Sequence, residues 1–125
     1  MLKITQVGRV MVPVSDQDAA IGFYTDKLGF SVAADVPFGN GERWVEVAPP
    51  DGGANLALVP PQGGFQTGQM TGIALGSKDP RADHAALQAS GVDVDPHLMG
   101  GEGGVPLMFF FRDNNKNHLM VVQEQ

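Results

Sequence analysis

The sequence contains no cysteine, which excludes disulfide bonds, thiolate metal sites and cysteine nucleophiles. No apolar run approaches the ~18 residues of a membrane-spanning helix, so we expect no membrane partner. The first residues lack the long apolar segment of a secretory signal, and a cytoplasmic location is the expectation. Basic residues are also few: 8 Lys and Arg stand against 14 Asp and Glu, which gives a net charge of −6 and argues against nucleic acid as a partner.

Glycine and hydrophobic residues are plentiful by contrast. Seventeen Gly and nine Pro predict many turns, and a hydrophobic content of 42% is typical of a globular chain rather than a disordered one. A length of 125 residues suits one domain with a substantial core. We therefore expect a single domain over residues 1–125.

The chain repeats one pattern twice. An alternating apolar segment that ends at Val14 is followed by Asp16 and a helical stripe that ends at Leu28-Gly29. The second half repeats this order, with Asp79-Pro80 before its helix and Gly91 after it. A repeat of about 60 residues indicates one supersecondary unit used twice. Module 1 is expected over residues 1–61 and module 2 over residues 69–125, with a Pro- and Gly-rich linker at 60–68.

Each module is expected to follow the order βαβββ, which gives an α+β fold with mixed sheets. Segments with a period of two, or with short apolar runs between turn residues, predict the strands. The expected strands are residues 6–14, 30–35, Arg43–Ala48, Asn55–Val59, Met70–Ser77, 92–94, 107–112 and His118–Gln123. Two such half-cups that face each other would form a cleft between the modules.

Several short motifs carry a resemblance to a known family. They are Asp16, Ala19-Ala20, Phe23-Tyr24, Leu28-Gly29-Phe30, Arg43-Trp44, Pro49-Pro50 and the segment Phe111-Arg112-Asp113 with Asn117. Together they resemble the glyoxalase/bleomycin-resistance/extradiol-dioxygenase group, the vicinal oxygen chelate superfamily, over essentially the whole chain. The resemblance implies two βαβββ modules that form a curved mixed-sheet cleft.

The resemblance also implies where a metal would bind in catalytic members. A His on the first strand, a His on the fifth and a Glu on the eighth, with a fourth-strand ligand, hold a divalent cation there. These positions fall on Arg9, Gly72 and Met120, and the fourth-strand ligand falls on or near Leu56. Arg stays protonated, Gly and Leu have no ligand atom, and the Met thioether is too soft for a hard cation. We therefore expect no metal and no cofactor.

Strand parity predicts the residues that line the cleft. Most are apolar or aromatic with a few polar groups among them, as in small-molecule pockets. The expected lining is Arg9, Met11, Trp44, Glu46, Leu56, Leu58, Gly72, Ala74, Met108, Phe110, His118 and Met120. An alternative is that these side chains fill the cup as closed core. A cation on this apolar face needs a partner, and for Arg9 that partner is either Glu46 or a ligand carboxylate.

Two function classes follow from this interpretation, and a third stays open. The first is a metal-free protein that binds a small molecule, similar to the bleomycin-resistance proteins, whose acidic charge would suit a cationic ligand. The alternative is a catalytic member, a glyoxalase-type lyase, extradiol dioxygenase or thiol transferase with a divalent metal. The third is a structural or regulatory module. Unpaired strand edges and an apolar face predict a homodimer in each case.

Overall fold

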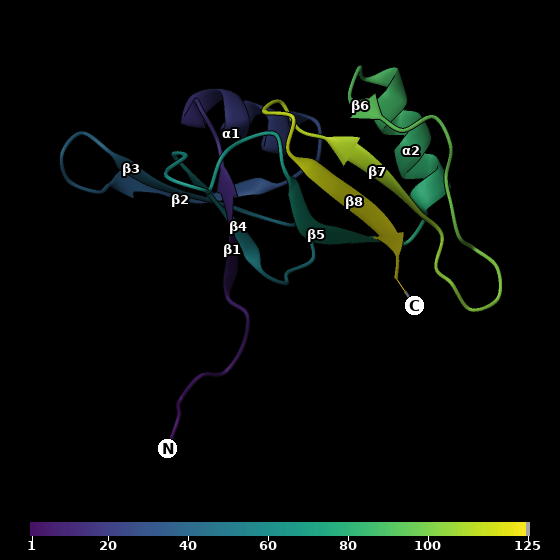
Figure 1. The fold of residues 1–125 in the computed structure, drawn as a ribbon, viewed down its shortest axis with the longest axis horizontal. Coiled ribbons are helices and arrows are strands. Elements are labelled where there is room, and N and C mark those ends of the chain that lie inside the picture. Colours follow the sequence, from purple (N-terminus) through teal and green to yellow (C-terminus); the bar gives the residue numbers. More distant parts are fainter. Residues whose placement is uncertain (125) are drawn as a thin grey trace. The chain divides into compact units, whose positions relative to one another are not determined.

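The computed structural model describes residues 1–124 and confirms the α+β class. The chain divides into two compact units, Met1–Gln66 and Thr67–Gln125, with the boundary inside the predicted linker. Each unit contains one helix and one four-stranded mixed sheet (Figure 1). Both helices have ten residues, and among residues 1–124 no helix has the length and apolar character needed to cross a membrane.

The first unit is built in the expected βαβββ order. Its elements are β1 (Arg9–Pro13), α1 (Gln17–Asp26), β2 (Ser31–Pro37), β3 (Arg43–Ala48) and β4 (Asn55–Val59). The strands lie in the order β1-β4-β3-β2, with β1 parallel to β4 and the other neighbours antiparallel. Residues 1–8 run into β1 as a segment without regular structure (Figure 1).

The second unit repeats this topology. Its elements are β5 (Met70–Ser77), α2 (Pro80–Ala89), β6 (Asp93–Val94), β7 (Met108–Arg112) and β8 (His118–Gln123). The strand order is β5-β8-β7-β6, again with one parallel pair, β5 and β8. The same strand order in both units confirms the internal duplication that the sequence predicts.

An aspartate caps the start of each helix. The side chain of Asp16 accepts a hydrogen bond from the amide of Ala19, and Asp79 accepts one from the amide of Ala82. These bonds satisfy amides that have no partner within the helix. The chain leaves α1 through Gly29, which has φ +75°, and leaves α2 near Gly91, which has φ +87°. Glycine adopts this left-handed conformation without steric cost.

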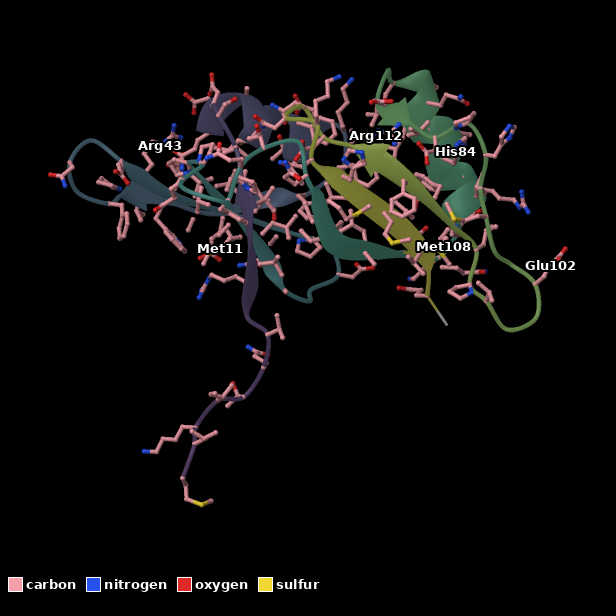
Figure 2. All side chains as sticks on the ribbon, viewed as in Figure 1. Met11, Arg43, His84, Glu102, Met108 and Arg112 are labelled. Carbon is pink, nitrogen blue, oxygen red and sulfur yellow. The ribbon has the colours of Figure 1, made fainter. Side chains whose placement is uncertain are left out.

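Each sheet buries one face against its helix. In the first unit, Tyr24 and Ala20 of α1 are fully buried together with valines and leucines of β1, β3 and β4. In the second, Phe109, Phe111 and Leu119 are fully buried. His84 of α2, labelled in Figure 2, packs edge-on against Phe109, and its Nε2 lies 2.7 Å from the carbonyl oxygen of Asp95.

The motif residues Asp113 and Asn117 lie in the turn that connects β7 to β8. Both Asp113 and Asn117 are buried. Oδ1 of Asp113 accepts hydrogen bonds from the amides of Asn115 and Asn117, and its Oδ2 accepts from Nδ2 of Asn117. Oδ1 of Asn117 accepts from the amide of Gly68, 49 residues earlier. These two residues therefore hold the turn and tie it to the chain that leads into β5.

Candidate functional site

Strand register groups one set of side chains on the face of the first sheet opposite the core valines. Met11 pairs with Ala57, which pairs with Glu46, and Arg9 pairs with Asn55 one row away. Neighbours in register project to the same side of a sheet. We call the face formed by Arg9, Met11, Trp44, Glu46, Asn55 and Ala57 the first open face. It brings together four of the predicted lining residues and adds Asn55, which the sequence interpretation missed.

A hydrogen-bond network occupies the centre of the first open face. The carboxylate of Glu46, only 5% exposed, accepts three hydrogen bonds. Nδ2 of Asn55 donates to Oε1 at 3.0 Å, while the indole Nε1 of Trp44 and Nε of Arg9 donate to Oε2 at 2.6 and 2.8 Å. The expected contact between Arg9 and Glu46 is therefore present, and the buried charge is compensated.

The network fixes the ionisation state of Glu46. The hydrogen bond from Asn55 contributes most to holding the pKa of the Glu46 carboxyl below its ordinary value of 4.5, and Trp44 and Arg9 lower the pKa further. Burial opposes them, because it disfavours the charged form. Glu46 is thus a carboxylate at neutral pH, and its lone pairs are directed to protein donors.

An aromatic pair borders this network. The ring of Phe38 lies 5.8 Å from that of Trp44, centroid to centroid, and Phe38 is 62% exposed. Met11, on the neighbouring part of the face, is also exposed and is labelled in Figure 2. An exposed aromatic and thioether surface beside a satisfied polar network is the composition of a small-molecule contact surface.

The expected placement of Leu56 and Leu58 is wrong. Register pairs Leu56 with Val10 and Leu58 with Val12, so both leucines belong to the core face, and both are buried. A shift of one residue moves every side chain of a strand to the opposite face. Matching Leu56 to Met120 as the ligand positions of the fourth and eighth strands, 64 residues apart, caused this error. The register gives an offset of 63 residues, which relates Asn55 to His118 and Ala57 to Met120.

The second sheet has a comparable face. Phe110 pairs with Met120, which pairs with Ala74, and Arg112 pairs with His118. Met108 lies two residues from Phe110 on β7, and Met108 and Arg112 mark the two ends of that strand in Figure 2. We call the face of Ala74, Met108, Phe110, Arg112, His118 and Met120 the second open face. The strand parity expected for these side chains is confirmed.

Polar groups mark one end of the second open face. Arg112 donates to both carboxylate oxygens of Asp93 and also pairs with Asp95. The bonds from Arg112 hold the pKa of Asp93 below its ordinary value. Beside Arg112, the Nδ1 atom of His118 is buried and has no hydrogen-bond partner within residues 1–124. A buried ring nitrogen without a hydrogen-bond partner costs free energy in the folded state.

Gly72 lies in an irregular part of β5. Met70 pairs with His118 and Ala74 with Met120. Between these two pairs β5 advances by four residues and β8 by only two, so β5 bulges there. Gly72 has φ +76°, and the hydroxyl of Thr71 fills the gap by donating to the carbonyl of His118 at 2.7 Å. The position that matches Arg9 in the repeat therefore carries no side chain and no regular strand geometry.

The residues at the family's metal positions do not fit a metal. By the 63-residue offset the fourth-strand position is Ala57, which lacks a ligand atom as Leu56 does. Arg9, Gly72 and Met120 supply no hard donor. The nearby carboxylate of Glu46 already accepts three protein hydrogen bonds. Within residues 1–124 no three His, Cys, Asp or Glu side chains gather closely enough to hold a metal ion.

Two βαβββ units with open sheet faces define a protein of the glyoxalase and bleomycin-resistance fold class. The chain belongs to the Glyoxalase/Bleomycin resistance protein/Dioxygenase superfamily, whose sequence profile matches residues 6–121. The resemblance inferred from the short motifs is thereby confirmed.

Solved structures and curated relatives agree with this assignment. TnmS3, an antibiotic binding protein from Streptomyces sp. CB03234, is 34% identical with a TM-score of 0.85, and the match covers 100% of both chains. A superfamily member from Sphaerobacter thermophilus DSM 20745 is 28% identical with a TM-score of 0.89, covering 98% of this chain and 100% of that one. The uncharacterized protein YetH of Bacillus subtilis (strain 168) is 34% identical over 115 residues, which are 90% of this chain and 94% of YetH.

Proposed function

We propose that this protein is a cytoplasmic, metal-free binder of a small aromatic molecule, held on the first open face by Trp44 and Phe38. The observation that carries the proposal is the aromatic pair of half-buried Trp44 and exposed Phe38 beside the hydrogen-bonded network of Glu46. Stacking on such rings, together with the removal of apolar area from water, stabilises a bound aromatic ligand. The antibiotic-binding relative TnmS3 supports the class of function.

In this proposal the second open face is a further small-molecule contact surface, on its own unit. Its Met108, Phe110 and Met120 are only partly buried, and His118 offers an unpaired ring nitrogen. Methionine and aromatic side chains adapt to ligands of irregular shape. The predicted lining residues of each module, except the two core leucines, are therefore retained in the proposal, each on the sheet of its own unit.

Trp44 is the only tryptophan, so its indole N–H gives a single reporter signal in a nitrogen–proton NMR spectrum. We expect titration with 2-naphthamide, a planar neutral probe, to shift this signal saturably. Replacing Trp44 by Leu is expected to weaken binding at least tenfold, measured by calorimetry, because the flat contact surface and its stacking are lost. The matched control is Phe65→Leu, which changes another exposed aromatic residue of the same unit.

Two outcomes would contradict the proposal. Binding unchanged by Trp44→Leu would remove the first open face as the site. Elemental analysis that finds about one Zn, Ni, Fe or Mn per chain after dialysis, with binding or lyase activity lost on chelation, would favour the catalytic alternative instead.

We also propose that the protein forms a twofold dimer. β2 is an edge strand of the first sheet, and Val32 and Val36 on it are about half exposed. An exposed apolar edge strand offers unpaired backbone groups with which a second chain can pair. Light scattering at micromolar concentration is expected to give twice the chain mass of 13.2 kDa. A mass of one chain across the concentration range would refute the dimer.

A further inference from the structure

Arg9 uses only part of its hydrogen-bonding capacity within the protein. Its Nε donates to Oε2 of Glu46 at 2.8 Å, and this is the only protein partner that the described residues provide for its guanidinium. The two terminal amino groups therefore keep four N–H donors. The Arg9 side chain is 50% exposed, whereas that of Glu46 is 6% exposed, so the outer part of the guanidinium is accessible.

The contact with Glu46 also sets the orientation of Arg9. Arginine has a planar, rigid guanidinium, and holding one edge of it restricts the direction of the two terminal amino groups. Glu46 is itself held by Asn55 and Trp44, so this anchor does not depend on Arg9 alone. A pre-oriented fork loses less conformational entropy on binding a ligand than a free arginine side chain would.

The neighbours of this fork define the rest of the ligand. Trp44 donates to the same carboxylate oxygen as Arg9, so the indole ring and the guanidinium share one anchor atom. Met11 lies two residues from Arg9 on the same strand face. An apolar aromatic surface thus adjoins a cationic fork, whereas the negative charge of Glu46 is shielded by its three donors.

We infer that the first open face selects planar aromatic carboxylates, with the ring on Trp44 and the carboxylate on the two terminal amino groups of Arg9. This inference rests on the proposed function and adds its ligand class. The fork matches a carboxylate in bidentate geometry, and hydrogen bonds between charged groups are the stronger kind. The net charge of −6 disfavours anions at long range, but at physiological salt such effects are screened beyond about 8 Å.

The test compares 2-naphthoate with 2-naphthamide, which differ in charge but hardly in shape. We expect the unmodified protein to bind 2-naphthoate tenfold or more tightly, by calorimetry at physiological salt. In Arg9→Met this preference should disappear, because the affinity for 2-naphthoate falls by more than the affinity for 2-naphthamide. The control Arg81→Met makes the same change of net charge on α2 and should keep the preference.

A second variant tests whether the effect of Arg9→Met comes only from a folding defect. Arg9→Met with Glu46→Gln removes both charges, so no uncompensated carboxylate stays buried, and it should also lack the preference. A preference that persists in both Arg9 variants, or is absent from the unmodified protein while 2-naphthamide binds, overturns the inference and leaves the proposed function standing. Failure of both probes to bind the unmodified protein overturns the two together.

Discussion

Replacing Asn117 by alanine is expected to destabilise the protein by about 3 kcal/mol. The side chain is fully buried, donates to the buried carboxylate of Asp113 and accepts from the amide of Gly68. Its removal leaves a charged acceptor and a backbone donor without those bonds, and each costs about 1–3 kcal/mol. Urea unfolding followed by circular dichroism measures the change.

Asn114 provides the control in the same turn. It is exposed, so Asn114→Ala should change the free energy of unfolding by less than about 0.5 kcal/mol. Equal stability of the Asn117→Ala and Asn114→Ala variants would contradict the structural role that the fold assigns to Asn117.

Replacing Glu46 by alanine is expected to cost about 2–3 kcal/mol at pH 7, since three donors lose one acceptor group. Most of this loss comes from the partly buried donors of Asn55 and Trp44, which are left without their acceptor. The half-exposed Arg9 can form hydrogen bonds to water instead. Glu46→Gln should cost less, because an amide oxygen still accepts. Arg9→Met should destabilise the unmodified protein and have little effect once Glu46 is alanine.

The pH dependence of this effect has a definite sign. Because the pKa of Glu46 in the folded state lies below its ordinary value of 4.5, the ionised network stabilises the fold at every pH above that value. The contribution is lost as pH falls through the folded-state pKa. The difference in stability between the unmodified protein and Glu46→Ala should therefore shrink as the pH falls below 4.5.

Most of the element order could be predicted because local signals agree with the fold. Residues Arg43–Ala48, Asn55–Val59, Met70–Ser77 and His118–Gln123 form strands with the expected bounds. Capping aspartates and glycines with positive φ mark the helix ends. These features depend on neighbours within a few residues, which a sequence displays directly.

The face of β4 could not be read in the same way. Leu56-Ala57-Leu58 is apolar throughout, so the strand has no alternation that would distinguish its two sides. The polar residue at its start was the available signal: Asn55 has the parity of Ala57 and therefore identifies the face that carries Glu46. The irregular pairing of β5 is also invisible locally, because it depends on the register with β8, a strand more than 40 residues away.

The tie between Asn117 and Gly68 also limits where the backbone can turn between the modules. Val59 is fastened to the first unit by the amide of Val14, and Gly68 to the second by Asn117. Between them, Pro60 and Pro61 have fixed φ angles, and Gln62 and Phe65 exchange two backbone hydrogen bonds. The chain from Pro60 to Gly68 is therefore held by hydrogen bonds at both ends and across its middle, so this linker is itself a folded segment rather than an unrestrained connection.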